Sequence, residues 1–247
     1  MSPAMDPQAP PSDRRRSTRD RPAKAPLSEE AVVDAALAIL QSHGLEAVTM
    51  RRVGAALDTG AASLYVYISG REGLRRAMLD RVISTIELEG PDPPRWRAQL
   101  HSLLQRLRRA LMDHPGIAAM TLVKSPTTEA VLRLTENLLG ILLAGGIDPQ
   151  DAAWACDVLV MLVTAVAREE EVRRPRGQRN DHDRHEQVDE IYMTLVGLAP
   201  ERFPFLSSHA AQMVAGDGDD RFHFAIDVVI EGMVARATRR SSMAPGL

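Results

Sequence analysis

The chain contains a single cysteine, Cys156, so no disulfide can form within one copy of it, which fits a reducing compartment. Aromatic residues make up only 4% of the sequence, while alanine, leucine, valine and arginine are abundant, a balance that favours helices over a β-sandwich. The formal net charge is −3, so no basic field surrounds the whole protein. Any surface for nucleic acid must therefore be local.

Long apolar segments are missing as well. The N-terminal residues contain no apolar stretch of the kind found in a secretory signal. The longest apolar run, around 158–166, contains Thr164 and ends at Arg168, short of the roughly 20 residues that a membrane span requires. We therefore expect a cytoplasmic protein without a membrane partner, in which this run forms a buried helix.

Residues 1–26 are rich in proline, arginine, serine and aspartate and show no hydrophobic periodicity, which predicts a disordered basic tail. Two interpretations of the tail stay open. It is either an arm that follows the minor groove or the phosphates of DNA, or a solvated tail with no partner. Deleting it would separate the two, because an arm contributes to DNA affinity and to its salt dependence.

The segment 27–90 reads as a run of short helices. Ser28 is a good N-cap with two glutamates in the first turn after it, and Gly44 ends this helix. Thr49 is placed to cap a short second helix, a third is expected over 61–67, and Ser69 is placed to cap a linking helix over 71–89. Three short helices joined by tight turns predict a helix-turn-helix head, whose third helix lies in the major groove of DNA.

Beyond Pro91–Pro94, a break that separates head from body, every periodic segment is helical. The expected helices span residues 96–113, 117–123, 127–145, 148–173, 188–198, 207–214 and 221–239. The helix over 148–173 is apolar almost all round, so it should be central or at an interface, and 174–187 should be polar and mobile. The prediction is an all-α chain with a C-terminal helical domain over 91–247.

The head resembles the tetracycline-repressor family. The motifs that carry the resemblance occur in register: Gly44, Thr49-Met50-Arg51, Ser63-Leu64-Tyr65-Val66-Tyr67 and Arg71-Glu72-Gly73-Leu74. One position departs from the pattern, since Asp58 stands in the turn where the family usually has glycine. Aspartate tolerates the left-handed conformation that this turn requires, so the turn is expected to persist.

The resemblance implies a DNA-contacting surface. Thr49 can offer its hydroxyl and nearby N–H groups to a phosphate, and Arg51 can make a bidentate contact to guanine or phosphate. Tyr65 and Tyr67 match aromatic positions that contact phosphate in the family, although Tyr65 is also open to a packing role, and Arg71 stands where the family has a phosphate-binding lysine. The expected set is Thr49, Met50, Arg51, Ala61, Ala62, Ser63, Tyr65, Val66, Tyr67 and Arg71.

The C-terminal half also resembles this family, through Pro126-Thr127, a Gly-Ile-Asp-Pro junction at 146–149 and the final helix from Phe222 to Gly232. The resemblance implies a homodimer through the helices 150–172 and 221–239, with two heads about one turn of DNA apart. It also implies a small-molecule pocket among the helices of residues 95–165. Candidate liners are Trp96, Leu100, His101, Leu104, Met112, His114, Met120, Leu138, Trp154, Val158 and Met161, with the two histidines as polar groups and each open to a plain core role.

These features predict a transcriptional repressor that a small, largely apolar effector releases from a palindromic operator by moving the linking helix. Thr121 lies where tetracycline repressors have a metal-holding histidine, so we expect no magnesium–tetracycline chemistry, no other metal and no cofactor. We also expect no catalytic residues.

The alternative is a helical small-molecule-binding module, or an enzyme, that does not bind DNA. His182, His185 and Glu186 are metal-ligand types at helical spacing, but they stand in a polar, arginine-rich stretch without an apolar surround. The sequence contains no nucleophile-elbow or phosphate-loop pattern, and Cys156 should be inert within its apolar helix. A gel shift at two salt concentrations separates the readings, since a repressor shows a steep salt dependence and a specific site.

Overall fold

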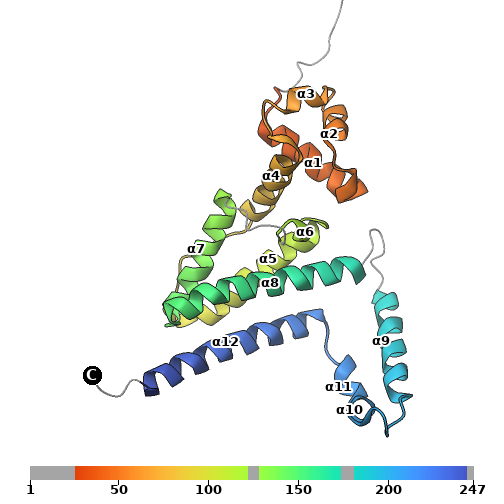
Figure 1. The fold of residues 1–247 in the computed structure, drawn as a ribbon, viewed down its shortest axis with the longest axis vertical. Helices are drawn as coiled ribbons and strands as arrows, with labels where there is room; N and C mark the ends of the chain where they lie inside the picture. Colours follow the sequence, from red (N-terminus) through yellow and green to blue (C-terminus); the bar gives the residue numbers. More distant parts are fainter. Residues whose placement is uncertain (1–25, 122–127, 174–180, 244–247) are drawn as a thin grey trace, which may run out of the picture.

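Figure 1 shows the computed structural model, which describes residues 26–121, 128–173 and 181–243. Within these residues every regular element is a helix, and the all-α class is confirmed. The elements are α1 (Glu29–His43), η1 (Leu45–Ala47), α2 (Met50–Ala56), α3 (Ala61–Leu64), α4 (Gly70–Ser84), η2 (Pro93–Arg95), α5 (Trp96–Asp113), α6 (Ala118–Thr121), α7 (Glu129–Ala144), α8 (Pro149–Arg173), α9 (Asp181–Val196), α10 (Pro204–Ser208), α11 (Ala210–Val214) and α12 (Gly218–Met243). The predicted basic tail lies outside the described residues, as do 122–127 and 174–180.

The two N-caps predicted for α1 and α2 are confirmed. The hydroxyl of Ser28 accepts a hydrogen bond from the N–H of Ala31 at 3.2 Å, and the hydroxyl of Thr49 accepts one from the N–H of Arg52 at 3.2 Å. Each cap satisfies one of the N–H groups that the first turn of a helix leaves unpaired. Gly44 ends α1 with a φ of 91°, a conformation that favours glycine.

The linking helix α4 differs from its prediction at both ends. Ser69 precedes it but makes no capping bond through its side chain. The helix ends at Ser84 rather than near residue 89, where the hydroxyls of Ser84 and Thr85 bond back to carbonyls of the last turn at 2.8 and 2.7 Å. Such bonds compete with continuation of the helix. The segment that follows is held by side chains of α5 and α7 instead, as when Gln99 donates to the carbonyl of Gly90 at 2.8 Å.

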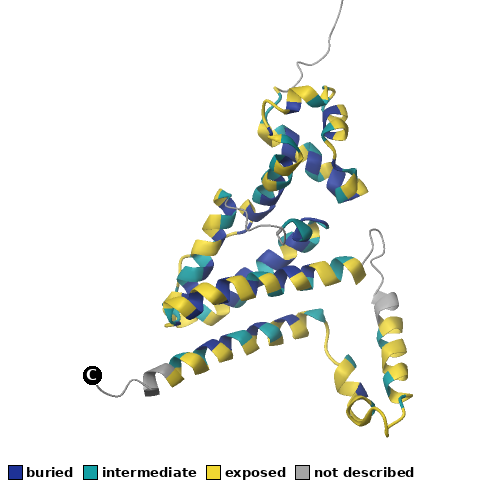
Figure 2. Ribbon diagram, viewed as in Figure 1, coloured by how far each residue is buried: buried dark blue, intermediate teal, exposed yellow. Residues whose placement is uncertain are grey.

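One hydrophobic core runs from the head into the body (Figure 2). In the head it is formed by the inner faces of α1, α2 and α4, and in the body α5 packs between α7 and α8. Its fully buried large side chains are Leu40, Leu64, Leu74, Met78, Leu79, Leu100, Leu103, Leu104, Leu111, Ile117, Leu138 and Phe222. Because α4 contributes to both parts, head and body share this core rather than being joined by a free linker.

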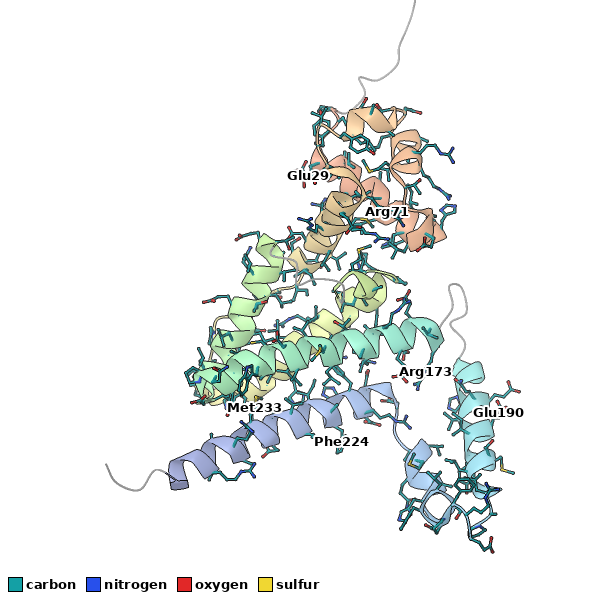
Figure 3. All side chains as sticks on the ribbon, in the orientation of Figure 1. Glu29, Arg71, Arg173, Glu190, Phe224 and Met233 are labelled. Atoms are coloured by element: carbon teal, nitrogen blue, oxygen red, sulfur yellow. The ribbon has the colours of Figure 1, made fainter. Side chains whose placement is uncertain are left out.

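Two long helices close the body. The most apolar window of α8 has a mean hydropathy of 1.4, so by length and composition alone it could cross a membrane, but 44% of that window is buried inside the protein, as in a core helix. Helix α12 packs on α5 and α8 through Phe222, Ile226, Ile230 and Met233, which recur at helical spacing and are at most 6% exposed. Figure 3 shows Met233 on the side of α12 that faces α8, and Phe224 on the opposite side.

Helices α9, α10 and α11 form an arm over residues 181–214 that projects from the body and makes its main contacts within itself (Figure 1). The first helix of the arm begins at Asp181 rather than at Val188, so the stretch predicted to be mobile is helical from there on. The helix expected over 207–214 is divided in two at His209. In the arm, Ala210 is buried, while most of the large apolar side chains are exposed.

Candidate nucleic-acid interface

The tip of the head is a tight helix-turn-helix built by α2 and α3. A side chain at Gly54 would place its Cβ 2.9 Å from the carbonyl oxygen of Thr59 and 3.1 Å from the nitrogen of Ala61, so only glycine allows this approach of the two helices. Asp58 has a φ of 51°, the left-handed conformation expected of it in the turn. Sequence reasoning did not single out Gly54, although a glycine inside a short predicted helix is itself a signal of close packing.

The residues predicted to contact DNA lie together at this tip. Arg51 and Thr49 stand at the start of α2, and Ala62 and Ser63 on α3; all four are exposed. Met50 and Ala61 are half-buried, and Leu64, between them and the tyrosines, belongs to the core. The backbone winding of α3 continues past Leu64, since the N–H of Tyr67 bonds the carbonyl of Leu64 at 3.0 Å.

Three large side chains extend from the end of α3 into solvent. Tyr65 is 58% exposed, Val66 81% and Tyr67 39%. The ring of Tyr65 also lies over Gly70, where an added Cβ would be 3.8 Å from its Cε1, so it combines packing with exposure. Exposed aromatic rings beside small residues form a surface that can approach a duplex closely.

The same tip carries uncommitted positive charge. Among the described residues, no hydrogen bond or ion pair holds the side chains of Arg51 and Arg52, and both are exposed. Arg71 lies 3.8 Å from Glu46, but both side chains are mostly exposed, and such surface pairs contribute little. Arg51 and Arg52 thus put positive charge at the tip that the net charge of the whole chain does not indicate.

The candidate pocket residues in the body fall into three groups. Leu100, Leu104 and Leu138 are fully buried within the core, whereas Trp96, Met112 and Met120 are half-buried. The members on α8 are exposed on its outer face: Trp154 57%, Val158 44% and Met161 57%. Their positions point away from the interior of the protomer, so the structure gives no support to their lining an internal pocket.

The two candidate polar groups of the pocket are already paired within the protein. The Nδ1 of His114 lies 2.9 Å from the carbonyl of Ala110, one turn earlier in α5. The Nε2 of His101 lies 2.8 Å from Asp227 Oδ1, and its Nδ1 lies 3.2 Å from His223 Nδ1, both on α12. His114 therefore makes a contact at the end of α5, and His101 joins α5 to α12.

A cavity of about 260 Å³ opens between α5, the end of α8 and the start of α12. Its walls include Gln105, Arg108, Arg109, Met112, Glu170 and Asp219, of which the sequence had indicated Met112 alone. A sequence signal exists for Arg108, because it occupies the apolar face of α5 between Leu104 and Leu111. A buried arginine on such a face needs a partner and so marks a polar site.

The linking helix connects head and body through specific contacts. Asp80 Oδ1 accepts a hydrogen bond from the N–H of Ala130 at 2.9 Å and so caps α7. Thr128 occupies the N-cap position but makes no capping bond through its side chain. Gly116 packs directly on the head, since an added Cβ would lie 3.1 Å from Leu45.

In the described part of the chain, no three His, Cys, Asp or Glu side chains are arranged to hold a metal ion. His182, one of the candidate ligands, falls outside the described side chains. Burial raises the pKa of the Cys156 thiol to about 11, with a further contribution from the nearby carboxylate of Asp157. A thiol with so high a pKa is a poor nucleophile near neutral pH.

Two family profiles match this chain. Residues 32–78 match the profile described as bacterial regulatory proteins of the tetR family, and residues 90–237 match the tetracyclin repressor-like C-terminal domain. A relative from Streptomyces coeruleorubidus, the HTH-type transcriptional repressor DrrR1, is 28% identical over 237 residues that make up 92% of this chain and 86% of that protein.

Solved structures agree with these matches. The apo structure of ActR from Streptomyces coelicolor superposes with a TM-score of 0.78 and 31% identity, covering 88% of this chain and all of that one. ActR in complex with actinorhodin gives a TM-score of 0.77 and 30% identity, with 85% of this chain and 97% of that one covered. The chain therefore belongs to the tetR family, whose members are non-enzymatic, and is a DNA-binding transcriptional regulator.

Proposed function

We propose that this regulator is a dimeric repressor that leaves a palindromic operator when a small molecule binds to its body. The observation that carries the proposal is the tip of the head, where Arg51, Ser63, Tyr65 and Tyr67 are exposed together around a tight helix-turn-helix. The relative DrrR1 bears the name of a repressor, and ActR has been solved with (S)-DNPA and with actinorhodin. The expected site of action is the cytoplasm, where operator DNA is accessible.

In this proposal α3 enters the major groove. Ala61, Ala62 and Ser63 are small enough for the helix to approach base edges, and Arg51 reaches a guanine or a phosphate from the start of α2. Tyr65, Tyr67 and Arg71 contact the phosphate backbone beside it, while Thr49, Met50 and Val66 complete the surface. With few long polar side chains on α3, part of the specificity comes from DNA shape.

The second copy covers the outer faces of α8 and α12. On α8, the apolar side chains of Trp154, Val158 and Met161 are exposed at helical spacing, with the exposed Asp157 beside them. On α12, Phe224 and Val228 are 69% and 54% exposed on the face opposite the core. Two stripes of this kind on adjacent helices form a self-complementary surface under two-fold symmetry, and the pairing of two copies sets the distance between their heads.

The contacts of α4 provide the route from body to head. Asp80 joins α4 to the start of α7, and Gly116 joins the loop before α6 to Leu45 of the head. A ligand that binds one arrangement of the body better than another shifts the population of these contacts and thereby the position of the heads. The coupling requires differential affinity, so an effector that leaves operator affinity unchanged contradicts it.

The test starts from DNA, because the operator sequence is unknown. The full chain is used to select binding sites from a random duplex library, and the enriched sites are measured by gel shift at several salt concentrations. We expect a palindrome with half-sites about one helical turn apart and a steep fall of affinity with salt. A failure to enrich any sequence, together with a flat salt dependence, would instead identify a helical binding module that does not bind DNA.

A further inference from the structure

The segment between the end of α4 at Ser84 and the start of η2 at Pro93 joins the head to the body, and most of it has no regular structure of its own. Backbone groups without a helical partner need other groups to bond them. Side chains of the body supply these bonds at several positions within residues 89–92. These residues, called the junction below, are therefore held in place by the body.

Gln99 of α5 bonds the junction twice. Its Oε1 accepts the N–H of Asp92 at 2.7 Å, and its Nε2 donates to the carbonyl of Gly90 at 2.8 Å. The residue is only 5% exposed. Because its amide is buried, a movement of the junction would break both bonds without giving water in exchange. Gln99 therefore fixes the junction on α5.

Helix α7 holds the same junction from a second side. The Nδ2 of Asn137 donates to the carbonyl of Glu89 at 2.7 Å. A Cβ added at Gly140 would lie 3.0 Å from Cγ of Pro91, so the ring of Pro91 lies directly on the backbone of α7. Arg106 of α5 adds an ion pair with the carboxylate of Glu89 at 3.0 Å. Two helices of the body thus bind a single short piece of chain.

The position of the junction matters because α4 carries the head. Helix α4 runs from the head to the body, where it packs on α7 (Figure 1). It has 15 residues and is therefore about 22 Å long. A change of about 10° in its direction moves its far end by roughly 4 Å, close to the rise of about 3.4 Å of one base pair. A small rotation of α4 is enough to bring a head to the wrong base pair.

The polar bonds at the junction restrict this rotation in a way that apolar packing does not. The contacts of α4 with the body are largely apolar, and such contacts are not directional. Hydrogen bonds from buried amides have a defined length and direction. The bonds of Gln99 and Asn137 therefore select one direction of α4 among those that the packing allows.

We infer that Gln99, Asn137 and Arg106, together called the junction clamp, fix the direction of the head and thereby the spacing of half-sites that the regulator accepts. The three residues act through α4 and are positioning residues for operator recognition. The inference rests on the proposed function, since half-site spacing requires two heads on one palindrome. It assigns specificity for spacing to the body, and specificity for sequence stays with the tip of the head.

The test variant combines Gln99→Met with Asn137→Leu, which keeps the approximate size of both side chains and removes their bonds to the junction. Operators with half-sites one base pair closer or further apart are compared by gel shift. We expect the wild type to lose about tenfold or more in affinity at either changed spacing, since one particle no longer binds both half-sites well. In the double variant this preference should shrink to about threefold or less, because a freer head can follow its half-site.

Two controls separate positioning from damage to the fold. Gln105→Met makes the same substitution on the same helix at a residue outside the junction clamp, and it should keep the wild-type preference for spacing. A duplex with a single half-site should bind the wild type and the double variant equally, because the head itself is unchanged. If its affinity for the double variant falls as much as that of the full operator, the clamp does not act by positioning.

A second measurement requires neither an operator nor a dimer. Spin labels at His43→Cys on the head and Gln150→Cys on the body, both exposed positions, report the distance between head and body in a chain that also carries Cys156→Ala. Labelled chains are diluted into unlabelled ones, so that each distance lies within one copy. We expect one narrow distance with the clamp intact and a broad distribution in the double variant.

The inference is rejected if the double variant keeps the wild-type preference for spacing or if its distances between head and body stay narrow. A wild type that selects a palindrome, together with an unchanged double variant, rejects the clamp alone. If the wild type selects no palindrome, the proposed function fails, and the distances between head and body then decide whether the clamp positions the head.

Discussion

Two surfaces of this protein expose large apolar side chains, and they differ in what surrounds these side chains. At the tip of the head, Tyr65, Val66 and Tyr67 lie near arginines that no described residue pairs. On the outer face of the body, Trp154, Val158 and Met161 on α8 have one exposed carboxylate, Asp157, beside them and no arginine among them. The first environment suits a polyanion and the second a copy of itself, so the same exposure indicates different partners.

The comparison also shows why exposed area alone is a weak guide. The arm of α9 to α11 exposes apolar side chains too, such as Tyr192 and Val196 one turn apart on α9, and Phe205 at 80%. The type of partner follows from the groups beside the exposed apolar side chains. These groups determine whether water, phosphate or another apolar face covers the surface best. Changing the groups beside each surface should therefore weaken its binding to one type of partner only.

The outer face of the body should be the more sensitive of the two surfaces. Val158→Asp places one new carboxylate from each copy in the proposed dimer interface. Neither of the two finds a partner there, so we expect a monomer. Operator affinity should then fall at least about a hundredfold, because the two half-sites are no longer bound by one particle. Light scattering after size exclusion gives the mass, and gel shift gives the affinity.

Leu132→Asp is the control for this variant. Leu132 on α7 is 51% exposed, so it has a similar exposure but lies outside the stripes on α8 and α12. It should leave both mass and operator affinity unchanged. If Val158→Asp remains a dimer with wild-type affinity for the operator, the two copies meet on another face.

At the tip of the head, charge is the feature to remove. Arg51→Ala should lower operator affinity about tenfold to a hundredfold, since one bidentate contact to a base or phosphate is lost. A base contact would relax specificity at one position of the site, whereas a phosphate contact would lower the salt slope by about one unit. Arg133→Ala in the body serves as the control, and an equal loss in both variants would point to general electrostatics.

Much of the structure of the head could be predicted from the sequence. Ser28, Gly44 and Thr49 act locally, through caps and a positive φ, so their roles in the head follow from neighbouring residues. The same holds for Asp58, whose left-handed backbone depends on the turn alone. The exposed tip was predictable because the family motifs occur in register along the chain.

The body was less predictable because its contacts join residues far apart in the chain. Nothing near Arg108 indicates that Asp219 will pair with it, and nothing near Ala130 indicates that Asp80 will cap its helix. The pocket residues on α8 were assigned by hydrophobicity, which cannot tell the inner from the outer face of a helix that is apolar all round. Trp154 and Cys156, two residues apart, lie on opposite faces.

A smaller effect is expected from one hydroxyl at the tip. Tyr67→Phe keeps the ring and its packing and removes the group that would bond a phosphate, so operator affinity should fall about fivefold, the equivalent of roughly 1 kcal/mol. Tyr192→Phe is a close control, because Tyr192 on the arm is 38% exposed, against 39% for Tyr67. An unchanged affinity in Tyr67→Phe would mean that the ring, and not the hydroxyl, contacts the DNA.

The smallest effect is expected at Cys156, on the inner face of α8 behind the proposed interface. Because burial raises its pKa to about 11, roughly one thiol in a thousand is ionised at about pH 8, and alkylation by iodoacetamide should be slow. Reactivity should rise only as the pH approaches that pKa or as denaturant unfolds the chain. Monomeric Val158→Asp should label as slowly as the wild type, because the thiol faces the core and not the partner. Fast labelling of that variant alone would show that dimerisation, rather than the fold of the protomer, covers the inner face of α8.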